Sequence, residues 1–153
     1  MSEDRRLARL TRLCLALPDA TAERHGSHAT FRVRKRVFAY FLDDHHGDGI
    51  VSLCWKAELG EAHERAEADP EHFYLPAYIG PRGWGALRLD RGPVDWEEVA
   101  DLVRASYCAV APRTLAERVP NLQSAADESR FRAANSSARP RAARARGARR
   151  TRR

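Results

Sequence analysis

The first seventeen residues carry apolar side chains at the spacing of one helical face. Leu7, Leu10, Cys14 and Leu17 recur every three or four positions, and arginines occupy many of the positions between them. Apolar residues that repeat with a helical period favour an amphipathic helix. Because a proline disfavours helical geometry in the residue before it, Pro18 marks the end. The pattern predicts a helix over residues 3–17.

After residue 20 the pattern changes from a helical period to alternation. A short strand is expected over residues 21–25, followed by a break at Gly26-Ser27. The apolar residues of 28–42 then fall in two registers, with Phe31, Val33, Val37, Ala39 and Phe41 in the first and Phe38, Tyr40 and Leu42 in the second. One strand of that length would exceed the usual size of roughly 3–10 residues. Since Arg34-Lys35 is the only polar interruption, we expect a hairpin turn there.

Residues 43–49 resemble a metal-binding loop at first sight. Asp44, His46, Asp48 and Gly49 fit the beginning of a calcium-loop template, but Trp55 stands where that template needs a glutamate. We therefore interpret the segment as a polar turn before a strand over residues 50–55, and expect no metal site. Occasional metal binding by the clustered imidazoles and carboxylates is the alternative.

The second half of the chain predicts two helices around a hairpin. An acidic helix is expected over residues 58–69, and a hairpin over 76–89 with its turn at Gly80-Pro81-Arg82-Gly83. Asp95 and Glu98 form a capping-box pair at the start of a further helix. The inner stripe of that helix is expected to contain Trp96, Val99, Leu102, Val103, Ser106 and Tyr107, and a last helical turn follows at 111–115.

The order of these elements indicates the fold class. Consecutive strands with segregated helices predict an α+β domain, in which an antiparallel sheet has its helices packed on one face. Charge then divides the chain. The formal charge is +6, but residues 123–153 carry ten arginines and only two acids, whereas residues 1–122 have a net charge of −2. We expect a single domain over 1–122 and a disordered arginine-rich tail over 123–153.

Several functional classes lack the residues that they need. Cys14, Cys54 and Cys108 form no C-x-x-C pair and are expected to be reduced, largely buried thiols. No phosphate-cradling glycine loop, G-x-S-x-G elbow or H-E-x-x-H motif occurs, so no enzyme activity and no cofactor are expected. No apolar run reaches the roughly 18 residues that a membrane span requires, and no signal peptide is evident. A cytoplasmic location without membrane contact is the expectation.

Five short motifs in a fixed order resemble the MmcQ/YjbR family of small bacterial proteins. They are Phe31-Arg-Val33 with Lys35 and Phe38-Ala39, Lys56 after a long strand, Pro76-Ala-Tyr78 through Gly80-x-x-Gly83-Trp84, Ser106-Tyr107, and Ala111-Pro112-Arg113. The resemblance covers about residues 5–118 and implies a CyaY-like fold and DNA binding through two hairpin "wings". The family often has Gly-Lys at the first tip, where this chain has Arg34-Lys35-Arg36, and the tail lies outside the family pattern.

The sequence therefore predicts non-specific DNA binding, mostly to the phosphate backbone, with the tail reinforcing the two hairpin tips. Cations at spaced positions suit phosphates, and an aromatic beside them can stack on a base. The candidate contact residues are Arg32, Arg34, Lys35, Arg36, Lys56, Arg82, Trp84 and Arg113. The alternative is a protein-interaction module with no nucleic-acid role, whose sheet face or acidic helix docks an unknown protein partner while the tail only solvates.

Overall fold

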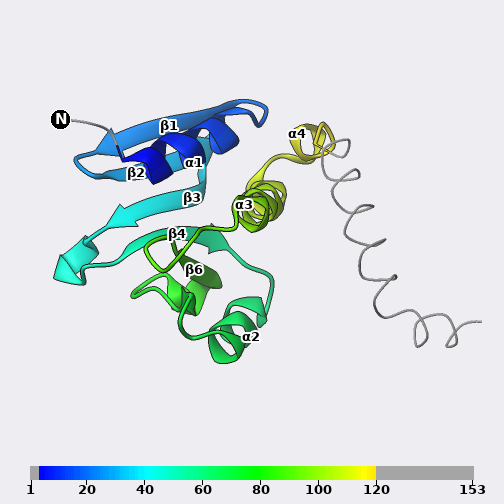
Figure 1. Ribbon diagram of the computed structural model, residues 1–153. Helices are drawn as coiled ribbons and strands as arrows, with labels where there is room; N and C mark the ends of the chain where they lie inside the picture. The colour runs from blue at the N-terminus through cyan, green and yellow to red at the C-terminus, as the bar shows by residue number, and fades with distance from the viewer. Residues whose placement is uncertain (1–3, 120–153) are drawn as a thin grey trace, which may run out of the picture. The chain divides into compact units, whose positions relative to one another are not determined.

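A computed structural model of the protein describes residues 4–119, and Figure 1 shows the arrangement of its elements. Six strands form one antiparallel sheet in the order β1-β2-β3-β4-β6-β5. The strands are β1 (Ala20–His25), β2 (His28–Val33), β3 (Arg36–Asp43), β4 (Val51–Lys56), β5 (Phe73–Tyr74) and β6 (Trp84–Arg88). The expected domain boundary after residue 122, and the tail over 123–153, lie outside the described residues.

The helices are α1 (Arg5–Leu15), α2 (Glu61–Ala68), α3 (Trp96–Val110) and α4 (Arg113–Ala116), with short 3-10 turns η1 (His45–Gly47) and η2 (Gly80–Arg82). Aspartates begin two of the helices. The Asp4 side chain accepts the N–H of Arg6, and Asp95 accepts those of Glu97 and Glu98. The predicted cap at Asp95 is confirmed, while the Glu98 carboxylate binds Arg65 of α2 instead of closing a capping box.

The helices pack on one face of the sheet, as the sequence predicts. One buried cluster joins Leu7 and Leu10 of α1, Ala62 of α2 and Val103 of α3 to the strands. Its strand residues include Phe31, Phe41, Leu53 and Trp55. The opposite face carries a smaller cluster of Cys54, Trp84 and Ala86, to which no helix within residues 4–119 contributes. The α+β architecture with helices on one face is thereby confirmed, and the other face of the sheet remains open.

The C-terminal half of α3 is fixed to the sheet by two side chains. The buried hydroxyl of Ser106 donates to the carbonyl of Phe38 at 2.6 Å and accepts the N–H of Lys56 at 2.8 Å. The Tyr107 hydroxyl donates to the carbonyl of Pro18 at 2.6 Å, and its ring meets Phe38 edge to face. The Ser106-Tyr107 motif therefore ties one helix to β3, to β4 and to the segment after α1.

The structure corrects one prediction about β3. The alternation places Phe38 in the register of Tyr40 and Leu42, yet Phe38 belongs to the helix-side core, while Tyr40 and Leu42 lie on the open face. The cause is a register shift, because Phe31 pairs with Ala39 but Arg32 pairs with Val37, which leaves Phe38 as an extra residue. Such a bulge reverses the face to which the residues on either side of it point.

The predicted hairpin over 76–89 is partly wrong. Its second strand forms as β6, but Tyr78 and Ile79 are not in a strand, and β6 pairs instead with β5. Residues 75–83 form the connection between β5 and β6. Tyr78 has a left-handed φ of 68°, and η2 ends at Gly83, where φ is 96°. Left-handed backbone cannot continue a ladder of paired strands, so the chain turns before it reaches the sheet.

The three cysteines form no disulfide, in agreement with the expected reduced thiols. Cys14 and Cys54 are fully buried and Cys108 is half-buried. Burial raises the pKa of the Cys54 thiol to about 12 and that of Cys14 even further, so neither thiol is a ready nucleophile. Among the helices within residues 4–119, none combines the length and the apolar character that crossing a membrane requires.

Candidate nucleic-acid interface

Both predicted tips lie at the same end of the sheet. Val33 ends β2 opposite Arg36 at the start of β3, and Lys56 ends β4 opposite Trp84 at the start of β6. Since Ala39 pairs with Trp55, the beginning of β3 lies beside the end of β4. The pairing therefore brings the turn at residues 34–35 and the turn at 80–83 to the same end of the sheet.

Two of the arginines around the first turn are already paired with carboxylates. Arg32 on β2 donates to Glu23 on β1 at 2.6 Å, and Arg34 donates to Asp19 at 2.9 Å. Lys35 and Arg36 are exposed, and neither forms an ion pair with an acid in the part of the chain that the structure describes. The first turn thus presents two cations that a phosphate could reach without displacing a carboxylate.

Arg34 has a left-handed backbone, with φ of 59°, which costs a residue with a Cβ atom roughly 1–2 kcal/mol. We predict that Arg34→Gly leaves the free energy of unfolding within about 1 kcal/mol of the native value, because relief of this strain offsets the entropy of glycine and a weak exposed ion pair. Lys35→Gly, at a position with ordinary φ, is expected to cost about 0.5–1 kcal/mol. Urea unfolding of both variants gives the comparison, and a greater loss in Arg34→Gly would contradict the strain argument.

Arg113 belongs to the surroundings of the first turn. Arg34, Lys35 and Arg36 line one side of an open hollow of about 720 Å3, and residues 109–112, at the end of α3, line the other. Arg113 follows directly in the chain, with its side chain 90% exposed and its guanidinium donating to Glu117 at 3.1 Å. The fold therefore adds a further, paired cation to this end of the sheet.

The second turn is held together by Lys56. The Lys56 ammonium donates to the backbone carbonyl of Arg82 at 2.5 Å, and a Cβ atom at Gly83 would lie 3.2 Å from that ammonium. The Arg82 side chain is exposed and forms no ion pair with an acid among residues 4–119. Of the two predicted contact residues, Lys56 supports the turn and Arg82 faces the solvent.

Trp84 does not offer a free ring. Its side chain is 8% exposed and packs on the open face of the sheet, with the Tyr40 ring 5.2 Å away between centroids. A base could stack on it only if this packing opened, so the structure gives no support to Trp84 as a stacking contact. Among the eight predicted contact residues, Lys35, Arg36 and Arg82 are the ones with exposed and unpaired charges.

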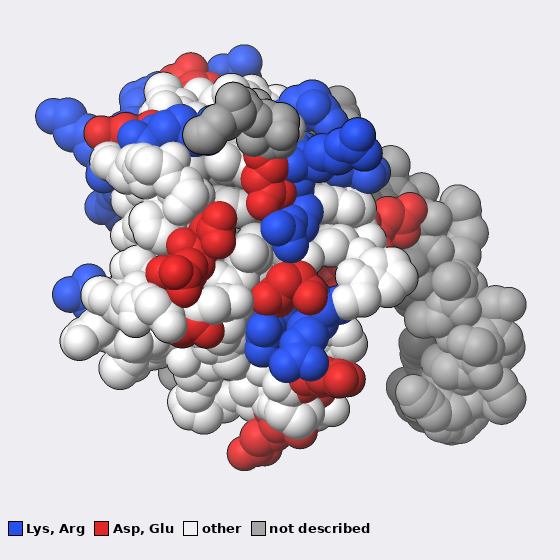
Figure 2. Space-filling model, turned by 60° about the vertical axis from the view of Figure 1, so that its left-hand side comes forward, with Lys and Arg blue, Asp and Glu red and all other residues white. Residues whose placement is uncertain are grey.

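The charges on the surface are mixed. On the face in Figure 2, blue basic and red acidic side chains lie side by side in several places, with white surface between them. This distribution agrees with the net charge of −2 over residues 1–122. A folded domain of this kind has little long-range attraction for a polyanion, so contacts to phosphate depend on the few free cations at that end of the sheet.

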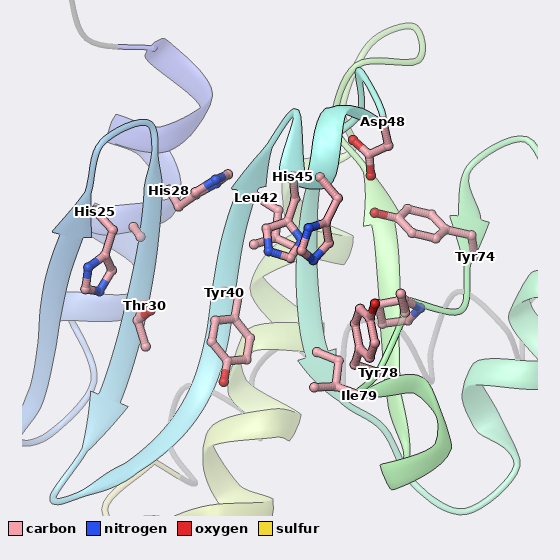
Figure 3. Close-up of a pocket in the computed structure, with 14 residues that line it drawn as sticks. His25, His28, Thr30, Tyr40, Leu42, His45, Asp48, Tyr74, Tyr78 and Ile79 are labelled. Atoms are coloured by element: carbon pink, nitrogen blue, oxygen red, sulfur yellow. The ribbon is translucent and has the colours of Figure 1, made fainter.

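The open face carries a groove that the sequence does not reveal. It has a volume of about 520 Å3 and lies over the middle of the sheet, between the β1–β2 turn and the connection 75–83. Figure 3 looks onto it: Thr30 and Tyr40 rise from neighbouring strands, and Tyr78 and Ile79 come from the connection. Its walls are mainly apolar and aromatic. Its residues come from separate strands and turns, so no run of sequence marks the groove.

Histidines occupy one end of this groove. The His28 and His45 rings meet edge to face, with 5.4 Å between their centroids, and the centroid of the His46 ring lies 3.9 Å from that of His45. Burial, together with the neighbouring imidazoles, lowers the pKa of His45, which favours its neutral form. Within residues 4–119 no group of three His, Cys, Asp or Glu side chains is arranged to hold a metal ion. Of these three rings, that of His28 has a hydrogen bond within the described residues, because its Nδ1 accepts the N–H of Asp43.

Three comparisons place the chain among known proteins. The YjbR family model matches residues 15–109, and no curated protein matches. Among solved structures, the crystal structure of Deinococcus radiodurans protein DR2400, which carries the family-model domain DUF419, is similar with a TM-score of 0.56 and 24% sequence identity. The match covers 68% of this chain and 77% of that one. At this identity the likeness shows a shared fold.

Proposed function

The chain belongs to the YjbR family, and from this premise we propose that it is a non-enzymatic protein that binds DNA through the phosphate backbone. The membership confirms the family resemblance, and the match over residues 15–109 includes four of the five motifs. Within the domain, the proposal narrows the contact set to Lys35, Arg36 and Arg82. The arginines of residues 123–153 supply a second, independent set of phosphate contacts.

The observation that carries the proposal is the position of these three cations. They come from two turns that are far apart in sequence, and strand pairing brings both turns to the same end of the sheet. Spaced cations at one end can follow the phosphates of a duplex, and arginine can contact phosphate oxygens in a bidentate manner. Within residues 4–119, the helices α1, α2, α3 and α4 all bury side chains in the core, and Lys35, Arg36 and Arg82 lie outside these helices. The expected binding is therefore non-specific.

The test measures DNA affinity by fluorescence anisotropy with a random duplex, across a range of salt concentrations. It uses the full chain and residues 1–122, which include all the core residues that the structure describes. Residues 1–122 are expected to show a log–log salt slope of about −3, from three phosphate contacts of about 0.9 each. If the ten arginines of residues 123–153 also contact phosphates, the salt slope of the full chain becomes more negative by about 9. The triple variant Lys35→Glu, Arg36→Glu, Arg82→Glu is expected to lose at least about tenfold in affinity.

A control variant has the same net charge as this triple variant, so a difference in affinity between the two cannot come from net charge. Arg5→Glu, Arg12→Glu, Arg118→Glu makes the same change in charge at exposed positions on α1 and after α4. This control is expected to bind almost as well as the parent. An equal loss in the two triple variants, or binding that requires the tail alone, would reject the domain as a DNA reader. The second outcome would favour a protein-interaction role for the folded domain.

A further inference from the structure

The groove on the open face has the size and the walls of a small-molecule site. Pockets for such ligands usually measure about 300–1,000 Å3 and are lined by apolar and aromatic side chains with a few polar groups. This groove, at about 520 Å3, lies within that range. Its floor is stiff, because Tyr40 packs on Trp84 with 5.2 Å between ring centroids. Leu42 and Ile79 add apolar wall on either side.

Tyr78 stands at the rim in a conformation that costs free energy. Its φ of 68° is rare for a bulky side chain, and its side chain remains 79% exposed. Two backbone hydrogen bonds hold the loop in this shape, from Ile79 N–H to the carbonyl of Ala77 and from Gly80 N–H to that of Pro76. Strained residues that their surroundings hold in place are frequent at ligand clamps. The loop thus presents an aromatic ring beside an aromatic floor.

Polar groups with no protein partner line the same groove. Thr30 is 8% exposed, and its hydroxyl makes no hydrogen bond to any residue in 4–119. The Tyr40 hydroxyl likewise bonds to no residue in that range. The Nδ1 atom of His28 accepts the N–H of Asp43 at 3.1 Å, so the neutral ring carries its proton on Nε2 and can donate it. A ligand that fits these groups needs hydrogen-bonding edges as well as flat faces.

Within residues 4–119, no lysine or arginine lines the groove. Its ionisable side chains are histidines, tyrosines and Asp48, and the hydroxyl of Tyr74 stays protonated because burial raises its pKa to about 12. A phosphate or another strong anion would find no permanent cation to pair with inside the walls. The interior suits a neutral ring, whereas the free cations Lys35, Arg36 and Arg82 lie outside the groove at one end of the sheet.

We propose that this groove binds a neutral planar heteroaromatic ring with hydrogen-bonding edges, the chemistry that a nucleobase presents. The ring lies against Tyr40 and under Tyr78, and its edge faces the hydroxyl of Thr30 and the Nε2–H of His28. Proteins that bind single-stranded nucleic acids commonly hold the bases by stacking them on aromatic side chains. The base comes from a free nucleoside or from an unpaired position in a strand. The site uses other residues than the proposed phosphate contacts, and neither depends on the other.

The test follows backbone amide shifts of the full chain by NMR during titration with adenosine, with thymidine, and with a short single-stranded oligonucleotide. Saturable shifts at Thr30, Tyr40 and Ile79 are expected with at least one probe. Saturation by a nucleoside assigns the site to free ligands, and saturation by the oligonucleotide alone assigns it to bases in a strand. Tyr78→Asn removes the ring but tolerates the left-handed backbone. This variant and Thr30→Val are each expected to bind at least tenfold more weakly.

Leu59→Ala is the matched control, since Leu59 is a fully exposed apolar residue outside the groove. It is expected to bind the probes as the parent does. Absence of saturation with every probe, equal weakening in Leu59→Ala, or equal affinity for phenylalanine amide, a ring without polar edges, would overturn the proposal. Nucleoside binding is expected to persist in the triple variant of Lys35, Arg36 and Arg82. Loss of duplex binding and loss of groove binding are therefore separate results.

Discussion

Ser106→Ala is expected to destabilise the protein by about 2–6 kcal/mol. The substitution removes one hydroxyl, but two backbone groups lose their partner: the carbonyl of Phe38 and the N–H of Lys56. Leaving a buried polar group unsatisfied costs about 1–3 kcal/mol for each group. Ser106 is 0% exposed, so water cannot replace the hydroxyl without opening the packing of α3 on the sheet. Urea unfolding, followed by circular dichroism, measures the loss.

Ser52→Ala provides a control with the same chemical change and the same burial. Ser52 is also 0% exposed, but its hydroxyl bonds to the hydroxyl of Tyr74, which lines the open groove. Because solvent can reach the Tyr74 side, this variant is expected to lose only about 1 kcal/mol, the value of one hydrogen bond. Equal losses in the two alanine variants would show that the double backbone contact of Ser106 is not what holds α3.

Gly85→Ala is expected to cost about 3 kcal/mol, through overpacking between the sheet and α2. A Cβ atom at this position would lie 2.6 Å from Cη2 and 2.9 Å from Cζ3 of Trp55, and 3.0 Å from the Cβ of Ala62. The Trp55 ring cannot move aside easily, because it is 1% exposed and packs against Phe73. In a strand, alanine would otherwise be favoured over glycine by roughly 0.5–1 kcal/mol. The close contact outweighs this preference, so the substitution is expected to destabilise the protein.

A double-mutant cycle with Trp55→Phe checks the cause of this loss. The smaller ring gives room to the new methyl group, so Gly85→Ala is expected to cost at least about 1 kcal/mol less in the Trp55→Phe background. Gly80→Ala serves as the reference, because its Cβ would meet its nearest atom at 3.5 Å and its φ is ordinary. That variant is expected to unfold close to the native midpoint. A cost at Gly85 that does not depend on residue 55 would place the strain elsewhere.

Local patterns predict a large part of this fold. The first turn follows from Arg34-Lys35, the only polar break in an apolar stretch, and the stripe of α3 follows from helical spacing. The bulge at Phe38 could not be predicted in this way, because it depends on how β2 pairs with β3. The strand that pairs with β6 could not be predicted from local patterns either. Tyr78 is of a residue type common in strands, but its left-handed backbone prevents it from forming strand hydrogen bonds.

The candidate sites show the same division between local and long-range information. The cations at both turns are visible in the sequence, but whether they are free depends on partners distant in the chain, as with Arg34 and Asp19 or Arg32 and Glu23. Trp84 was predicted as a contact residue from its place beside a turn, and its burial depends on packing against Tyr40 of β3, which lies beyond β4 in the sheet. The groove unites side chains from several elements, so it exists only in the folded sheet.

The anchoring of the sheet by α3 has a consequence for the growing polypeptide. Synthesis runs from the N-terminus, so all six strands are complete before residues 96–110 have been made. Until then, Phe38 of β3 lacks the Tyr107 ring that packs on it, and the core residues of β3 and β4 lack the helix that covers them. A released chain that ends before Ser106 would have a sheet whose apolar face lacks this helix, and exposed hydrophobic surface of this kind is what chaperones bind. The helix α3 is thus made after all six strands, and the core of the sheet is complete only when this helix has packed on it.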